Sequence, residues 1–317
     1  MKFPPIDLTR VVTYSLKQRR SKVAAEVLGV PWRARGKMRD FLSSLPRTLA
    51  AADLREIVQS IAAAVRAQRP VVLGMGAHPL KVGLSPLIID LLERGVLSAV
   101  AMNGAGIIHD FELAYHGATS EDVAEALADG SFGMARETGE FLNAAIHAGV
   151  AQAGVGIGRA VGERMRVAGL PYVQLSVLAA CARLDVPACV HVAVGTDIIH
   201  MHPQADGAAL GEGSLRDFHR LTAVVAQLEG GVFINLGSAV IIPEVFLKAL
   251  ALARNLGHTV NAFTTVDLDF VRHYRPAMNI VGRPTQQGGR GFHLTGHHEI
   301  LFPLLCAAVI EELATPS

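Results

Sequence analysis

The sequence has little cysteine, little net charge and no long uninterrupted hydrophobic run, and each shortage argues against a class of protein. Its 317 residues include three cysteines without metal-ligand spacing, which argues against a disulfide framework. A net charge of +1 argues against a dedicated nucleic-acid binder. Polar residues and glycines interrupt every apolar stretch before it could cross a bilayer, and the start, MKFPPIDLTR, holds no hydrophobic signal region. We therefore expect a cytoplasmic protein without membrane or nucleic-acid partners.

Half of the residues are hydrophobic and 18% are charged, so the chain can bury a large core. The excess of apolar residues also suggests buried surface between subunits of a homo-oligomer. Residues 1–50 contain four prolines and mixed charge, and we expect an N-terminal arm or small helical extension that packs on a neighbour. Residues 51–317 are expected to form a single α/β domain.

Short apolar runs alternate with amphipathic segments from residue 51 onward, which predicts a parallel sheet covered by helices on both faces. The predicted strands are Pro70–Met75, Leu97–Met102, Ala188–Val194, Gly231–Asn235, Thr259–Thr264 and Met278–Val281. The predicted helices are Ala52–Ala67, Leu84–Arg94, Glu121–Leu127, Gly133–Ala148, Tyr172–Leu184, Ser214–Leu228, Pro243–Leu256 and His298–Leu313.

Polar and glycine-rich segments follow five of these strands. Ligands of open α/β sheets bind outside the carboxyl ends of the strands, so these segments predict a binding site. The five segments are residues 74–81, 103–112, 195–203, 235–239 and 264–269.

Residues 273–300 combine three arginines, four histidines and five glycines. Glycine permits positive φ and close backbone approach, and arginine suits an anionic group. The segment therefore indicates the wall of a site in which Arg275, Arg283 and Arg290 bind a carboxylate or phosphate of the substrate.

Two patterns have competing interpretations. Residues 154–162, GVGIGRAVG, imitate a dinucleotide fingerprint but follow a helix-like segment, so we favour a close helix contact. The histidines could either bind a metal ion or line a pocket as hydrogen-bonding groups, and we favour the pocket without a metal. The candidate ligands are His109, Asp110, Asp197, His200 and His202.

Several of these segments resemble the deoxyhypusine synthase family, over roughly residues 70–310. Residues 103–110, NGAGIIHD, are similar to that family's T-A-G-G-V/I-E-E-D loop. Residues 235–240, NLGSAV, resemble its L-G-G-G-V-P-K-H turn, and residues 264–269, TTVDLD, resemble N-T-A-Q-E-F-D. Arg275-Pro276 falls where the family has A-R-P-D-E-A.

The resemblance implies a three-layer α/β/α Rossmann-like fold, a homotetramer and NAD as cofactor. Members of the family oxidise spermidine and move its aminobutyl group through an enzyme lysine to a protein lysine. Asp267 and Asp269 would face an amine, because each carboxylate can hold one ammonium group. The residues on the NAD side would be Gly104, Ala105, Gly106, Asp197, Gly237, Ser238, Thr264 and Thr265.

The chain departs from the family where the covalent chemistry takes place. The family's catalytic lysine lies in S-W-G-K, where this chain has residues 279–283 ending in Arg283. Arginine stays protonated and does not form an imine. The family's P-K-H histidine is also absent, since Ile241 and Ile242 stand near its place. Among the six lysines only Lys81 lies in a predicted site segment, as a candidate catalytic residue or a plain surface lysine.

We therefore predict an NAD-binding transferase or oxidoreductase that acts on a small amine or carboxylate-bearing substrate and is not a true deoxyhypusine synthase. His109, His200 or His202 could serve as the general base. One alternative is a metal-assisted hydrolase or lyase that uses Asp110, Asp197, His200 and His202. Another is a non-catalytic nucleotide-sensing oligomer.

Overall fold

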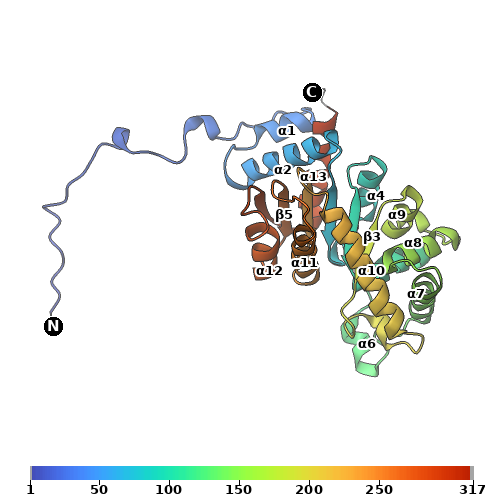
Figure 1. Ribbon diagram of the computed structural model, residues 1–317. Coiled ribbons are helices and arrows are strands. Elements are labelled where there is room, and N and C mark those ends of the chain that lie inside the picture. Colours follow the sequence, from blue (N-terminus) through green and yellow to red (C-terminus); the bar gives the residue numbers. More distant parts are fainter. Residues whose placement is uncertain (1, 315–317) are drawn as a thin grey trace.

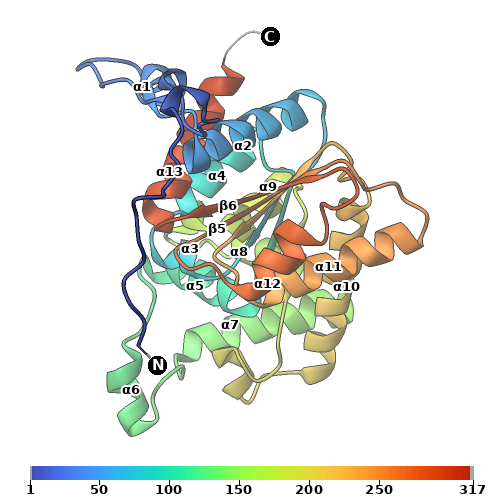
Figure 2. The same ribbon diagram turned by 90° about the vertical axis from the view of Figure 1, so that its left-hand side faces the viewer.

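The computed structural model describes residues 2–314 and contains a six-stranded, fully parallel sheet in that range. Its strand order is β3-β2-β1-β4-β5-β6, and Figure 2 shows β5 and β6 side by side. The direction of strand succession reverses between β1 and β4, which is where a doubly wound sheet opens a crevice for ligands. The strands are β1 (Val71–Met75), β2 (Ala99–Asn103), β3 (Ala188–His191), β4 (Val232–Leu236), β5 (Thr264–Asp269) and β6 (Arg290–Thr295).

Alternate residues of each strand enter two separate hydrophobic cores. Val71, Leu73 and Met75 pack in one core, while Val72 packs in the other. Helices α2 (Leu49–Arg66), α4 (Ser85–Glu93) and α13 (His298–Leu313) cover the first face, and α10 (Gly207–Val225) and α11 (Ile241–Asn255) cover the second. The predicted three-layer α/β/α architecture is confirmed.

The connection between β2 and β3 is a long helical crossover. It contains α5 (Gly104–His116), α6 (Val123–Asp129), α7 (Arg136–His147), the π-helix η3 (Ala148–Gln152), α8 (Ile157–Val167), the 3-10 helix η4 (Val173–Leu175) and α9 (Val177–Leu184). The other short elements follow strand ends. They are α3 (His78–Lys81), the 3-10 helix η5 (Ile198–Met201), α12 (Tyr274–Pro276) and the π-helix η6 (Ala277–Gly282).

Two strand predictions are wrong. The predicted strand Thr259–Thr264 is a loop whose Asn261 and Ala262 N–H groups donate to Glu229, and β5 begins only at Thr264. The predicted strand Met278–Val281 lies within η6, and β6 starts at Arg290. Short apolar runs do not distinguish a strand from a buried helix.

The other four strands were predicted close to their observed positions, and each predicted helix overlaps an observed one. Helices α3, α5 and α8 were not predicted. In α5 the glycines of its first turn hide a helical spacing of Ile107, Phe111 and Ala114, all of which are buried.

The N-terminal segment runs away from the body of the molecule (Figure 1). It contains the short 3-10 helices η1 (Leu16–Gln18) and η2 (Ala25–Val27) before α1 (Met38–Ser44). Its apolar side chains are exposed, Phe3 and Ile6 by 85% each. In residues 2–314 no helix is both long and apolar enough to cross a membrane.

Candidate active site at the carboxyl edge of the sheet

Two glycines and a histidine approach one another closely where β1 and β4 end. Gly76 N donates to Leu236 O at 3.1 Å, and a Cβ on Gly76 would collide with the carbonyl oxygen of Gly237. Gly237 has φ +66°, and a Cβ there would lie 2.6 Å from Cε1 of His298. Side chains at either position would close this contact, so the sequence needs glycine at both.

Asp197 and His200 lie beyond the ends of β2 and β3. The Asn103 side chain accepts from Gly106 N at 3.2 Å and caps α5. A Cβ on Gly104 would collide with Oδ2 of Asp197, so this carboxylate rests against the first turn of α5. Burial raises the pKa of Asp197, and its Oδ2 has no hydrogen-bond partner.

The His200 ring has a fixed orientation. Its Nδ1 accepts from Gly195 N at 3.1 Å and lies 3.4 Å from Asp197 N. Because Nδ1 accepts, a neutral His200 carries its proton on Nε2, which lies 3.9 Å from Asp197 Oδ2. His200 can therefore donate a hydrogen bond to a ligand.

A polar row crosses β4, β5 and β6. Asn235 Nδ2 donates to Asp267 Oδ1 at 2.8 Å, and His293 Nδ1 lies 3.1 Å from Asp267 Oδ2. At the edge, Asp269 lies 3.7 Å from His298 Nε2 and 3.9 Å from His273 Nε2. The structure thus brings both predicted amine-binding carboxylates to one side of β5.

Buried polar atoms without partners gather at this edge. Among the described residues nine such side-chain atoms occur, and seven lie in or just beyond strands β3 to β6. Six of the seven lie toward the carboxyl ends of the strands, whereas Thr265 is the second residue of β5. A buried polar atom without a partner costs stability, so the concentration of six at one edge indicates a site prepared for a ligand. The seven atoms are His191 Nε2, Asp197 Oδ2, His200 Nε2, Asn235 Oδ1, Thr265 Oγ1, His293 Nε2 and His298 Nδ1.

Three predicted catalytic residues instead make structural contacts within the protein. His109 Nδ1 lies 2.7 Å from Thr119 Oγ1, and burial, with a smaller effect of Lys81, lowers the pKa of His109 to about 4. Asp110 is fully buried and caps the start of α9. His202 Nε2 lies 2.9 Å from the Gly133 carbonyl oxygen, with its ring against Gly139. Lys81 is exposed.

The arginines do not converge on one ligand position. Arg290 is the first residue of β6, at the opposite edge of the sheet, and binds Glu56 and Ser60. Thr264 begins β5 at that same edge. Thr264 was predicted at the carboxyl end of a strand, but β5 starts at this residue, so Thr264 lies at the amino end of the strand.

Arg275 and Arg283 stay near α11 and η6. Arg275 Nε lies 3.3 Å from Glu244 Oε1, which also accepts from Asn279 Nδ2 at 2.9 Å. Arg283 donates to Asn279 Oδ1 at 2.7 Å. Arg275 thereby ties α12 to α11, and Arg283 orients Asn279, which ties η6 to α11.

Thr265, also predicted to bind the cofactor, is the second residue of β5 and lies near the edge opposite the site. The remaining predicted cofactor residues lie at the first turns of α5 and α11. A Cβ on Gly106 would lie 2.8 Å from Met102 Sδ, which allows α5 to pack close to β2. Ser238 Oγ accepts from Ile242 N at 3.2 Å. Ala105 follows Gly104 in the first turn of α5.

No group of three or more metal-ligand side chains occurs in the described part of the chain. The histidines and aspartates that sequence offered as ligands are divided among separate contacts, as described above.

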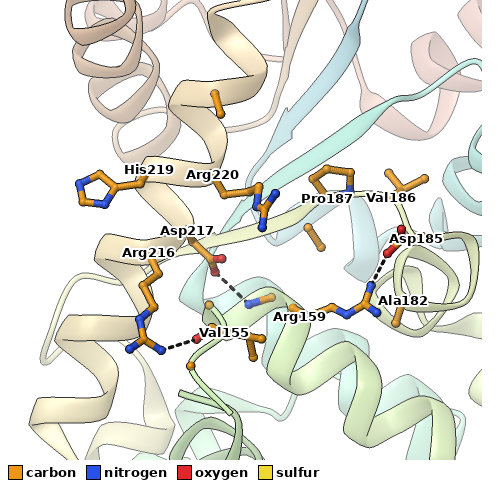
Figure 3. A pocket seen from close by; sticks show the side chains of 15 residues that line it. Val155, Arg159, Ala182, Asp185, Val186, Pro187, Arg216, Asp217, His219 and Arg220 are labelled. Carbon is orange, nitrogen blue, oxygen red and sulfur yellow. Dashed lines mark hydrogen bonds and ion pairs between the residues drawn. The ribbon is translucent and has the colours of Figure 1, made fainter. Parts of the chain in front are cut away.

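A separate cavity of about 660 Å³ lies beside β3, between α8 and α10 (Figure 3). Asp217 accepts there from Gly158 N at 2.9 Å and from Val190 N at 2.8 Å, while Ser214 Oγ accepts from Val192 N. A Cβ on Gly158 would collide with the Ala188 carbonyl oxygen. Gly158 therefore allows α8 to pack closely on β3, and Gly162 allows α8 to pack closely on α9, in agreement with the close helix contact favoured from the sequence.

Comparison with protein-family models and with curated protein sequences gives no match. Solved structures of similar fold include AgrE in ternary complex with ornithine and NAD+, at 12% identity and a TM-score of 0.52 over 84% of this chain and 34% of that one. A conserved protein assigned to the LOR/SDH group from Methanococcus maripaludis S2 matches at 16% identity, TM-score 0.52, 84% of this chain and 71% of that one. A protein assigned as a deoxyhypusine synthase from Entamoeba histolytica matches at 11% identity, TM-score 0.51, 89% and 96%.

The chain spans about a third of the length of AgrE and nearly the whole length of the deoxyhypusine synthase-like protein. At these identities the similarity concerns the fold. The resemblance to deoxyhypusine synthase found in the sequence is confirmed at that level.

Proposed function

We propose that this protein is an NAD-dependent enzyme that oxidises a small amine-bearing substrate at the carboxyl edge of its sheet. The observation that carries the proposal is the gathering of partnerless buried polar atoms at that edge, beside backbone that only glycine allows. The opposite edge carries no comparable set among residues 2–314.

The residues fit a dinucleotide at two points. In doubly wound sheets an acidic side chain accepts from a ribose hydroxyl, and Asp197 Oδ2 is a buried acceptor without a partner. The backbone near Gly76 and Gly237 is tight enough to need glycine, as it must be where a pyrophosphate approaches. Bound NAD would supply the hydride acceptor. The assignment of NAD is supported by the NAD+ complex of AgrE, a protein of similar fold.

Asp269 is the residue that we assign to the substrate amine. It is 6% exposed at the end of β5, with two histidines around it. A carboxylate is the natural partner of an ammonium group. Ornithine, the amino acid bound in AgrE, carries two amines and a carboxylate, so it is a suitable first probe. The segment where the related family has its lysine ends in Arg283, so we propose no covalent enzyme–substrate imine.

We further expect the protein to be a cytoplasmic homo-oligomer. The three cysteines are free and buried, as in a reducing compartment. The exposed apolar side chains of residues 2–36 suit contact with another subunit.

The decisive experiment is calorimetric titration of the protein with NAD, using two glycine variants as a matched pair. In Gly104→Ala the new Cβ displaces Asp197, and we expect NAD affinity to fall at least tenfold. Gly211→Ala lies in α10 with open space around it and should leave affinity unchanged. Asp197→Asn, which replaces an acceptor oxygen by a donor, should weaken binding by about tenfold as well.

Absence of NAD binding by the unmodified protein at millimolar concentration would refute the proposal. If NAD binds, reduction of NAD on addition of L-ornithine or spermidine tests the oxidation itself. Tight NAD binding without turnover of any amine would favour the nucleotide-sensing alternative. Hydrolysis that requires a metal ion would favour the alternative of a metal-assisted hydrolase or lyase.

A further inference from the structure

Three polar side chains form a row across adjacent strands on the face covered by α11 and η6. In the register of the parallel strands, Asn235 lies beside Asp267 and Asp267 lies beside His293. Asn235 Nδ2 and His293 Nδ1 each bind a different oxygen of the Asp267 carboxylate. The carboxylate is 2% exposed and engaged on both oxygens.

This arrangement fixes the position of the histidine proton. A carboxylate can only accept, so His293 Nδ1 must be the protonated, donating nitrogen. In the neutral ring, Nε2 then carries the lone pair. Nε2 is buried and has no hydrogen-bond partner. His293 therefore presents an unused proton acceptor.

His293 lies toward the carboxyl end of β6. A Cβ on Gly291, two residues earlier on the same face, would collide with the Val281 carbonyl oxygen, so η6 rests on β6 at that point. His293 lies one pleat nearer the edge, and its side chain is 13% exposed. Beside it on β5, Asp269 follows Asp267 on the same face and reaches the edge.

The three buried polar side chains of this row lower the stability of the folded protein. Its neighbours on this face, Phe233 and Ile242, belong to the hydrophobic core. Apolar residues at the three positions would pack there without leaving Asn235 Oδ1 and His293 Nε2 unpaired. Local sequence that opposes stability is expected at functional sites.

The three histidines predicted as bases from the sequence are less suitable. His200 Nδ1 accepts from backbone N–H groups, so its Nε2 carries a proton and can only donate. His202 Nε2 is bound to the Gly133 carbonyl oxygen, and His109 Nδ1 to Thr119.

We propose that His293 Nε2 is the proton acceptor of the oxidation, with Asp267 and Asn235 as its positioning residues; this rests on the function proposed above. Bound NAD would supply the acceptor for the hydrogen of the substrate C–H bond and both of its electrons. The N–H bond on the adjacent amine breaks and its proton goes to Nε2, while the C=N bond forms. The imidazolium that results is stabilised by the Asp267 carboxylate.

The first test uses ¹⁵N NMR of histidine-labelled full-length protein at pH 7. We expect the neutral ring of the unmodified His293 to carry its proton on Nδ1. In Asp267→Asn, the Asn235 side chain still donates to the oxygen at Oδ1, so the new amide NH2 faces His293 and forces the proton onto Nε2. His219→Gln removes an exposed histidine on α10 and should leave the His293 signals unchanged.

Observation of an imidazolium, or of the proton on Nε2, in the unmodified protein would overturn the proposal, as would an unchanged tautomer in Asp267→Asn. This result does not depend on NAD binding, so it stands even if the proposed function fails.

The second test compares NAD binding and turnover in His293→Gln. With the amine that reduces NAD in the unmodified protein, turnover should fall at least about 100-fold while the dissociation constant for NAD changes less than about threefold. Asp267→Asn should show the same division between turnover and binding. Turnover of His293→Gln within about threefold of the unmodified protein would overturn the proposal. Thermal unfolding of both variants establishes that they are folded.

Discussion

The molecule buries carboxylates in two different ways. Asp110, in the crossover, accepts from Ser176 Oγ and from the N–H groups of Val177 and Leu178, and Asp217 accepts from the edge of β3 and the start of α8. At the carboxyl edge of the sheet, Asp197 keeps one oxygen without a partner.

The difference separates carboxylates that hold the fold from those available to a ligand. In the first group the acceptors are used by backbone donors of helices and strands, which would otherwise lack partners. In the second, hydrogen-bonding capacity remains unused inside the protein. Burial alone does not distinguish the two groups, because all of these carboxylates are less than 9% exposed.

The largest effect is expected from Asp110→Ala. The change leaves two backbone N–H groups and one hydroxyl buried without an acceptor, so the free energy of unfolding should fall by about 2–4 kcal/mol. Urea denaturation measures it. Glu93→Ala removes an exposed partner of Arg183 and should cost no more than about 0.5 kcal/mol. Equal losses in the two variants would contradict the structural role of Asp110.

A smaller, pH-dependent effect is expected from Asp217→Asn. Burial, opposed by three backbone hydrogen bonds, raises the pKa of Asp217 to about 7 from 3.8. Between pH 4 and 7 the folded protein therefore holds a proton that the unfolded chain has lost, and stability falls as pH rises. The variant lacks this contribution, so relative to it the unmodified protein should lose up to about 1.4 kcal/mol per pH unit.

The unmodified protein must be compared with Asp217→Asn because buried histidines change the stability with pH in the opposite direction. Burial lowers the pKa of His191 to about 4, so that residue makes stability rise between pH 4 and 6.5. Chemical denaturation at several pH values gives the difference curve. A difference that does not change with pH would mean that Asp217 is ionised throughout this range.

The smallest effect is expected from Thr265→Val. Thr265 Oγ1 is buried without a partner in β5, so an isosteric valine should raise the free energy of unfolding by about 0.5–1 kcal/mol in the ligand-free protein. The matched variant Thr222→Val removes a hydroxyl that donates to the Phe218 carbonyl oxygen and should lower stability by a similar amount. Thermal unfolding distinguishes the signs. Destabilisation by both changes would show that Thr265 has a partner in solution.

Sequence patterns predict the framework better than the site. Strand β1 contains no polar side chain and β4 contains only Asn235; both are buried on both faces, and both were predicted close to their positions. In β5, Val266 and Leu268 alternate with Asp267 and Asp269, which form part of the polar face of the site. Because of these polar residues, the segment was assigned to the loop after a strand. The same substitution of polar for apolar residues that indicates a site also conceals the strand that carries it.

The roles of individual polar residues depend on contacts that no local pattern contains. Asp110 caps a helix 67 residues further along the chain, so a carboxylate beside a glycine-rich turn was predicted to be catalytic. His293 was seen within a histidine-rich segment but was not selected, because its pairing with Asp267 requires the register of β5 and β6. A period-two reading of residues 264–269 and 290–295 would have placed both on one face.

The contacts of Asp217 and Ser214 with β3 also affect how the protein behaves in a crowded solution. β3 ends the sheet on one side, and an open edge of this kind can pair with a strand of another molecule and start aggregation. The N–H groups of Val190 and Val192, which would recruit such a strand, are occupied by side chains of α10. The helix that covers the sheet thereby also stops it from growing.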